Sequence, residues 1–257
     1  MTDYRTVNRE AWNRLAAAGS DSSQPLGSAE LVQAAEWLCP EEWLPWQEIR
    51  TVLCLASGGG QQAPAFAMLG YEVTVVDLSP EQLARDSQVA ETLGLPLQCI
   101  EGNMLDLSIL HGSRFDLVYQ PISACYVPDV EELFRQVAAV LAPGGWYDVE
   151  HWNPVHVQLA GLGAWQNGYV VERPQGTGVP SIWTSETEGA QAEQITCWHF
   201  VHSLHDLIGG LCRNGFVVQR LRERPRGDPL AAPGSHEHLS AYLPAFMRVL
   251  AQRVPVG

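Results

Sequence analysis

The chain has no lysine, and basic residues of any kind are scarce. All 15 basic residues are arginine, against 29 acidic residues, and the formal net charge is −14 at pH 7. So large an acidic excess repels nucleic-acid phosphates and anionic lipid surfaces. The composition therefore argues against nucleic acid and membranes as partners.

Long apolar runs and cysteine motifs are also missing. No window approaches the roughly 20 apolar residues that a membrane-spanning helix needs. The N-terminus has neither an apolar signal core nor a basic leader. The cysteines form no CxxC motif and no regular framework, which predicts buried, reduced thiols. The six are Cys39, Cys54, Cys99, Cys125, Cys197 and Cys212. We expect a soluble cytoplasmic protein.

Strand and helix signals alternate from Arg50 onward. The run from Val52 to Leu55 is continuously apolar, as in a strand covered on both faces, and the β-branched residues of 72–78 predict a second strand. Ser79 and Asp129 each open a capping box, which predicts a helix start. This alternation predicts βαβ units and a parallel sheet.

Changes in periodicity divide the chain into five regions. The stretch 153–194 lacks clear periodicity, and so long a loop in a compact domain is usually functional. The stretch "ITCWHFVHSL" after it is predicted as a strand. We expect an N-terminal helical lid at 1–49, a core at 50–152, a substrate-side insertion at 153–195, the last two core strands at 196–225, and a linker with a C-terminal helix from about Glu237 to Arg253 at 226–257.

Three glycines, Gly58 to Gly60, follow the first predicted strand, where a ligand could approach the backbone. Asp77 ends the second predicted strand, and a carboxylate there can accept hydrogen bonds from both hydroxyls of a ribose. This pair favours a nucleoside site over a tight turn without a ligand. A short-chain nicotinamide dehydrogenase normally needs a Tyr-x-x-x-Lys pair, and the chain has no lysine, so this class is excluded. Other nicotinamide enzymes do not need lysine and stay open as an alternative.

The order of these motifs resembles the class I S-adenosylmethionine-dependent methyltransferases over about residues 50 to 225. The resemblance rests on "VLCLASGGG", "VTVVDLSPEQL", "IEGNMLDL", "FDLVYQPISACYVPDVEELFRQVAAVLAPGGW" and "GFVVQRLRE", the last of which looks like the antiparallel seventh strand. It implies a doubly wound α/β fold with a mostly parallel seven-stranded sheet and one antiparallel strand. The lid and an insertion after the fifth strand would be added to this sheet.

By the same resemblance, S-adenosyl-L-methionine is the cofactor. Asp77 would hold the ribose, Leu78 would pack on the adenine, and two further segments would bind its edge and the methionine amine. The implied cofactor residues are Ala56, Ser57, Gly58, Gly60, Asp77, Leu78, Asn103, Met104, Gln120 and Pro121. Two positions depart from the family pattern, because Cys54 replaces an acidic residue common on the first strand and Ala56 replaces the first glycine.

Candidates for acceptor chemistry lie at the same expected edge of the sheet. His151, at the end of the fifth strand, is the first choice for a base, and Tyr126 is the second. Tyr4 and Trp12 could close over the methionine end. The insertion tryptophans Trp152, Trp165 and Trp183 could form an apolar or cation-binding pocket, although packing of a long loop explains them equally well.

No metal site is expected. His199, His202 and His205 recur at a spacing of three, but their segment is predicted as a strand, on which they would face different sides. The sequence thus predicts methyl transfer to a small-molecule acceptor by in-line displacement. The alternatives are an NAD(P)-dependent oxidoreductase and a non-catalytic protein that binds S-adenosylmethionine. The sequence determines neither the acceptor nor the oligomeric state.

Overall fold

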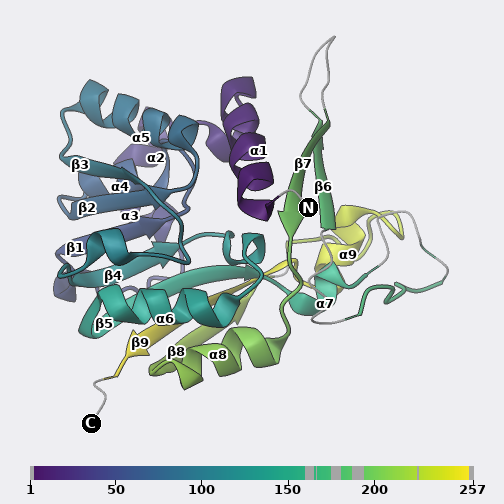
Figure 1. The fold of residues 1–257 in the computed structure, drawn as a ribbon. Coiled ribbons are helices and arrows are strands. Elements are labelled where there is room, and N and C mark those ends of the chain that lie inside the picture. Colours follow the sequence, from purple (N-terminus) through teal and green to yellow (C-terminus); the bar gives the residue numbers. More distant parts are fainter. Residues whose placement is uncertain are drawn as a thin grey trace.

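A seven-stranded sheet forms the centre of the protein (Figure 1). The computed structural model describes residues 3–159, 165, 167–174, 181–186, 194–224 and 226–254. The sheet order is β3-β2-β1-β4-β5-β9-β8. The strands are β1 (Thr51–Leu55), β2 (Glu72–Asp77), β3 (Leu97–Glu101), β4 (Phe115–Gln120), β5 (Leu141–Trp152), β8 (Phe216–Glu223) and β9 (Phe246–Arg253). The first five pair in parallel, which confirms the predicted doubly wound α/β sheet.

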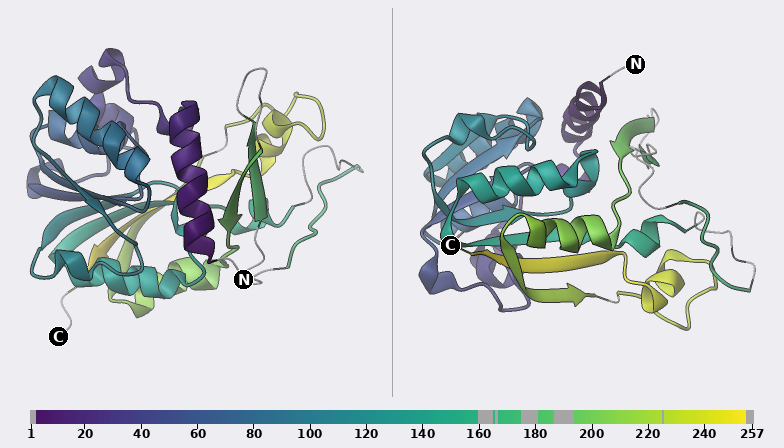
Figure 2. Two further views of the ribbon diagram at one scale, coloured as in Figure 1. Left: turned by 45° about the horizontal axis from the view of Figure 1, so that its top comes forward. Right: turned by 60° about the horizontal axis from the view of Figure 1, so that its bottom comes forward.

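Helices cover both faces of this sheet (Figure 2). The helices are α1 (Tyr4–Ala18), α2 (Ser28–Val32), α3 (Ala34–Leu38), α4 (Gln62–Met68), α5 (Pro80–Leu93), α6 (Val130–Val140), α7 (Pro154–Val157), α8 (Gly210–Arg213) and α9 (His236–Tyr242). Leu53 and Val118 pack with α6 and α8 on one face, whereas Val52 and Cys54 pack with α3 and α4 on the other. Successive residues of β1 therefore face opposite layers, as in a central strand.

The two predicted helix starts are confirmed. The Ser79 hydroxyl accepts a hydrogen bond from the Gln82 amide at 3.2 Å, at the start of α5. The Asp129 carboxylate likewise accepts from the Glu132 amide at 2.9 Å, at the start of α6. Both caps satisfy amide groups that the first turn of a helix leaves without a partner.

The C-terminal region differs from the sequence prediction. The predicted helix at Glu237–Arg253 is a short helix, α9, followed by strand β9. Strand β9 runs antiparallel to both of its neighbours, β5 and β8. It is therefore the strand of reversed direction, and β8, which was predicted to be reversed, is the edge strand. Because residues 247–251 of β9 are buried on both faces, they show no polar alternation that could mark them as a strand.

The predicted strand at 195–204 does not belong to the central sheet. Strand β7 (Gln194–His199) instead pairs antiparallel with β6 (Ser181–Glu186) in a separate two-stranded sheet. Figure 1 shows this small sheet beside α1. Region 196–225 thus contributes one core strand, β8, rather than two.

The N-terminal 49 residues divide into two parts. Helix α1 begins with the side chain of Asp3 as its cap and ends at Gly19, which has φ of 70°. It lies between α5 and β7 (Figure 1), whereas Leu31, Ala34 and Leu38 of α2 and α3 are buried against the sheet. None of the helices in the described ranges is long and apolar enough to cross a membrane.

Candidate active site

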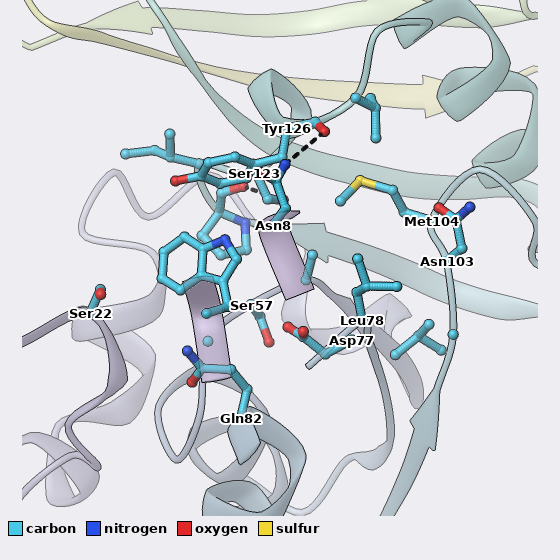
Figure 3. A pocket seen from close by; sticks show the side chains of 18 of the residues that line it. Asn8, Ser22, Ser57, Asp77, Leu78, Gln82, Asn103, Met104, Ser123 and Tyr126 are labelled. Carbon is cyan, nitrogen blue, oxygen red and sulfur yellow. Dashed lines mark hydrogen bonds between the residues drawn. The ribbon is translucent and has the colours of Figure 1, made fainter. Parts of the chain in front are cut away.

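A large pocket lies at the carboxyl ends of β1, β2, β4 and β5, with α1 across it (Figure 3). Its empty space is about 1150 Å³, including the solvent at its mouth. Four side chains of α1 line it, namely Tyr4, Arg5, Asn8 and Trp12. Ligands of open α/β sheets bind at this edge, so the pocket is the candidate active site.

The glycine loop after β1 is pressed against the protein's own N-terminal segment. Gly58 has φ of 78°, and a Cβ atom there would lie 2.9 Å from the carbonyl oxygen of Ser22. At Gly60, with φ of 80°, a Cβ atom would lie 3.0 Å from Pro25. Ala56 also has a positive φ, of 46°. Glycine is needed at positions 58 and 60 because φ is positive and because a side chain would collide with the N-terminal segment. The glycines therefore serve the packing of the chain itself as well as the approach of a ligand.

The structure brings most of the predicted cofactor residues together and leaves two outside. The residues that line the pocket are Ala56, Ser57, Gly58, Asp77, Leu78, Asn103, Met104 and Pro121. Gly60 does not line it, and its amide donates to the Asp86 carboxylate at 2.8 Å. Gln120 is buried below the pocket, where its amide oxygen accepts from the Tyr147 hydroxyl at 2.5 Å and its nitrogen donates to Ser123 Oγ at 2.8 Å.

Asp77 is a buried carboxyl group at the end of β2. One of its oxygens accepts a hydrogen bond from the Ser79 amide at 2.8 Å. Burial raises the pKa of Asp77 to about 6, although hydrogen bonds from the backbone of Ser79 and Leu78 act in the opposite direction. A buried carboxylate of this kind gains from hydroxyl donors, which would replace the water it has lost.

Three buried polar atoms in the pocket have no hydrogen-bond partner within the described part of the chain. They are Ser57 Oγ, Gln62 Oε1 and Gln82 Oε1, and all three residues line the pocket. Buried polar atoms of folded proteins are nearly always paired, so each needs an explanation. They are three of eight such atoms among the described residues, and a polar ligand in this pocket would supply the partners of these three.

His151 lies near the end of β5, as predicted, but its side chain does not line the pocket. The side chain is 3% exposed and packs against Phe134 of α6, with ring centroids 6.2 Å apart. Burial lowers the pKa of His151 to about 3, so the imidazole is neutral. The prediction of His151 as the base is corrected. Because side chains alternate along a strand, the neighbouring Glu150 faces the pocket instead.

Tyr126 does line the pocket, and it lies within an aromatic group. Its ring meets Trp12 edge-on at 5.3 Å and His199 at 4.7 Å between centroids. Burial raises the pKa of Tyr126 well above its usual value, so the hydroxyl stays protonated. Tyr126 is therefore a hydrogen-bonding group of the pocket rather than an ionised base.

The insertion tryptophans are not pocket residues where the structure describes them. Trp152 packs on Phe246, with ring centroids 4.5 Å apart, and Trp165 packs on His238 at 5.2 Å. The side chain of Trp183 lies outside the described residues. Within the described ranges, no group of three or more His, Cys, Asp or Glu side chains could hold a metal ion.

Several lining residues were not predicted. Asn8, Ser123 and Glu150 are the most informative, because each has a polar side chain at the pocket. Burial raises the pKa of Glu150, while the positive charges of Arg248 and Arg226 act against this rise. The parity of β5 could have revealed Glu150, since Tyr147 and Val149 are apolar and face α6.

Comparisons with known proteins identify the family of the chain. The profile of a family described as a methyltransferase domain matches residues 53–148. The uncharacterized methyltransferase YbaJ of Bacillus subtilis is 31% identical over 231 residues, which cover 86% of this chain and 90% of that protein. A ubiquinone biosynthesis O-methyltransferase of Bordetella avium is 28% identical over 51% of this chain and 63% of its own length.

Solved structures show the same fold. An S-adenosylmethionine-dependent methyltransferase of Mesorhizobium loti superposes with a TM-score of 0.62 at 25% identity, covering 87% of this chain and all of that one. The CcbJ methyltransferase of Streptomyces caelestis gives a TM-score of 0.65 at 16% identity, covering 98% and 99%. The chain therefore belongs to the class I S-adenosylmethionine-dependent methyltransferases, whose cofactor is S-adenosyl-L-methionine.

Proposed function

We propose that this pocket binds S-adenosylmethionine and that the protein transfers the cofactor's methyl group to a small-molecule acceptor. The observation that carries the proposal is the set of partnerless buried atoms at Ser57, Gln62 and Gln82 beside the carboxyl group of Asp77. A nucleoside with hydroxyl and amine donors provides partners of the right kind for these oxygens. The residues present therefore fit the cofactor.

Different walls of the pocket would hold different parts of the cofactor. Asp77 would accept hydrogen bonds from the ribose hydroxyls, and Leu78 would pack on the adenine. Asn103 and Met104 would flank the adenine edge, although the Asn103 side-chain oxygen already accepts from the Leu105 amide at 3.0 Å. Its side-chain nitrogen is the group left for the base.

The bound cofactor supplies an electrophilic methyl group for an in-line displacement. The work of the protein is then to position the acceptor and to exclude water. Trp12 and Tyr126 provide apolar surface over the pocket, and the protonated Tyr126 hydroxyl can orient an acceptor by donating a hydrogen bond. No covalent intermediate on the protein is required.

The similarity to ubiquinone biosynthesis O-methyltransferases supports a small molecule as the acceptor. The acidic chain, with a net charge of −14, also disfavours a nucleic-acid acceptor. We also propose that the enzyme is cytoplasmic, because its six cysteines are all free thiols, as is usual in a reducing compartment.

Calorimetry with S-adenosylhomocysteine tests the cofactor site. Asp77→Ala should weaken its binding by about 1.5 to 3 kcal/mol, because charge-assisted hydrogen bonds to the ribose are lost. Asp228→Ala, at an exposed position away from the pocket, is the matched control and should bind as the unmodified protein does. Unchanged affinity in folded Asp77→Ala would remove Asp77 from the site.

Turnover tests the reaction itself. The protein should form S-adenosylhomocysteine from S-adenosylmethionine with at least one member of a panel of small phenols, thiols and amines. Stabilisation by S-adenosylhomocysteine without turnover on any panel member would favour a non-catalytic binding protein.

A further inference from the structure

Only three charged side chains line the pocket among the described residues. They are Arg5, Asp77 and Glu150. Arg5 is already paired with Asp3, at 2.7 Å between Nη2 and Oδ2, and both side chains are largely exposed. Under the proposed function Asp77 serves the ribose. Glu150 is then the one carboxylate left among these residues for a positively charged ligand group.

Neither Cys54 nor the side chain of Gln120 offers a free acceptor to a ligand ammonium. Cys54 stands where an acid is common on the first strand, but its side chain is completely buried and does not line the pocket. Burial raises the pKa of the Cys54 thiol well above its usual value, so it carries no negative charge. The amide of Gln120 is bonded to Tyr147 and Ser123 below the pocket.

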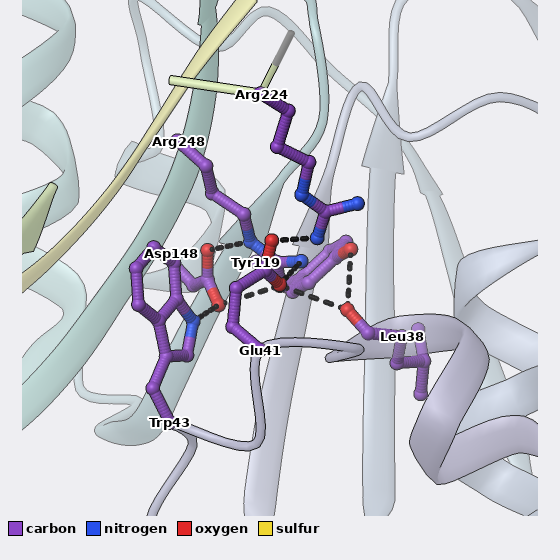
Figure 4. Close-up of polar contacts among 7 residues, drawn as sticks. All are labelled: Leu38, Glu41, Trp43, Tyr119, Asp148, Arg224 and Arg248. Atoms are coloured by element: carbon purple, nitrogen blue, oxygen red, sulfur yellow. Dashed lines mark hydrogen bonds and ion pairs between the residues drawn. The ribbon is translucent and has the colours of Figure 1, made fainter. Parts of the chain in front are cut away.

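Glu150 lies opposite an arginine whose hydrogen-bonding groups are engaged elsewhere, and the positive charges of Arg248 and Arg226 act on its carboxylate without a hydrogen bond. Arg248 of β9 lies directly opposite Glu150 of β5 in the sheet register. Its guanidinium instead bonds to Asp148, to Glu41 and to the carbonyl oxygen of Leu38 (Figure 4), with all four N–O distances between 2.7 and 3.0 Å. The Glu150 side chain forms no hydrogen bond or ion pair with any residue of the described ranges.

The register of the sheet places Glu150 beside the segment that follows β4. Gln120 pairs with Val149, so the next residues, Pro121 and Glu150, are neighbours, and both line the pocket. A ligand cation at this point would meet a half-buried carboxylate that has no hydrogen-bond partner among the described residues. A ligand cation gains more binding free energy from such a carboxylate than from one that is fully exposed or already paired.

We propose that Glu150 binds the ammonium of the methionine part of the cofactor, so that β5 supplies the anion that β1 lacks. The inference rests on the proposed function, since it needs the cofactor in this pocket. It assigns to one carboxylate a negative charge that neither Cys54 nor the side chain of Gln120 provides.

Two ligands separate this contact from the rest of the site. S-adenosylhomocysteine has the ammonium, whereas 5′-methylthioadenosine lacks the amino-acid part and keeps the nucleoside and the sulfur. Neither ligand carries the sulfonium charge, so attraction between Glu150 and a sulfonium cannot contribute to the measured difference in affinity. Calorimetry should show that Glu150→Gln weakens S-adenosylhomocysteine binding about 10- to 100-fold. Binding of 5′-methylthioadenosine should change less than about twofold, because sites without shared partners are independent.

Two further variants control for folding and charge. Glu72→Gln, at the exposed first residue of β2, should leave the affinities for both ligands unchanged. Glu150→Asp keeps the charge on a shorter side chain and should retain more affinity for S-adenosylhomocysteine than Glu150→Gln. Because burial raises the pKa of Glu150, the neutral glutamine should fold at least as well as the carboxylate.

The outcomes separate the two proposals. If the unmodified protein binds neither ligand, the proposed function is wrong and the assignment of Glu150 falls with it. If Glu150→Gln binds S-adenosylhomocysteine normally, or loses both ligands equally, only the assignment of Glu150 is overturned. Unchanged affinities with reduced turnover would place Glu150 at the acceptor instead and would also overturn the assignment.

Discussion

Arg248 on β9 and Asp148 on β5 form a two-pronged ion pair in the interior of the protein. Arg248 Nε lies 2.7 Å from Asp148 Oδ1, and Nη2 lies 2.7 Å from Oδ2. The side chains are 8% and 1% exposed. The same guanidinium reaches Glu41 and the carbonyl oxygen of Leu38, so it joins the end of α3 to the sheet. The pair therefore holds the N-terminal segment on the strands that form the pocket.

Arg248→Met should lower the free energy of unfolding by about 3 to 5 kcal/mol, because removing one partner of a buried pair leaves uncompensated charge on the other. Asp148 would lose its paired cation, whereas Glu41 would keep its ion pair with Arg224. Urea denaturation followed by tryptophan fluorescence measures the effect. Arg220→Met, at an exposed position on β8, is the control and should cost less than about 1 kcal/mol. A similarly small loss for Arg248→Met would show that the network contributes little to stability.

Local signals predicted the first half of the sheet correctly. The strand at Val52–Leu55, the caps at Ser79 and Asp129 and the carboxylate at Asp77 each depend on a few neighbouring residues. The chemistry of such signals is contained in the segment itself, so the sequence is enough to identify them.

The errors arose where distant contacts decide the outcome. Phe246–Arg253 contains residues that also suit a helix, and only pairing with β5 and β8 makes it a strand. His151 was predicted in place of Glu150, an error of one residue along β5. Val149 packs on the α6 side, so the next residue, Glu150, faces the opposite side of the sheet and His151 faces α6. Asn8 bonds to Trp198, 190 residues away, and no local pattern reveals that contact.

The raised pKa of Asp77 predicts a pH-dependent difference between the ligand-free protein and Asp77→Asn. The folded state favours the neutral carboxyl group, so the contribution of Asp77 to stability is fully present below about pH 4 and is lost as the pH rises through about 6. Asparagine keeps the shape and does not ionise. Between pH 4 and 7, the free energy of unfolding of Asp77→Asn should therefore rise relative to that of the unmodified protein by up to about 3 kcal/mol, as measured by urea denaturation. If the difference in the free energy of unfolding stayed constant across this range, the raised pKa of the buried Asp77 would be contradicted.

Ala56 sits in a conformation that favours glycine. Its φ of 46° lies in the left-handed region, which costs an alanine about 1 to 2 kcal/mol. Glycine removes that cost but loses about 0.5 to 1 kcal/mol more chain entropy on folding. Ala56→Gly should thus stabilise the protein by about 0.5 to 1 kcal/mol in thermal or urea unfolding. Ala17→Gly, on the exposed side of α1, should have the opposite sign. Destabilisation by both changes would indicate that the methyl group of Ala56 makes a contact worth more than the strain.

Asn8 is the residue through which α1 is fastened across the pocket. Its side-chain nitrogen donates to the carbonyl oxygens of Tyr126 and Trp198, at 3.4 and 3.1 Å, and its side-chain oxygen accepts from the Trp198 amide at 2.7 Å. We expect that α1 moves as a lid when these bonds are weakened. Asn8→Asp keeps the size of the side chain but places an acceptor against two carbonyl oxygens, which replaces attraction by repulsion.

The expected result of Asn8→Asp is local opening rather than global unfolding. Hydrogen exchange of the α1 amides should become faster while the amides of β1 and β4 keep their protection, because only the low-stability element is released. Release of S-adenosylhomocysteine, followed by stopped-flow fluorescence, should also accelerate, since a lid that opens more often sets the exit rate. Gln33→Glu, an exposed amide-to-carboxylate change between α2 and α3, should alter neither measurement. If exchange in α1 rises without faster release, α1 opens independently of the ligand and is a supporting wall of the pocket rather than its lid.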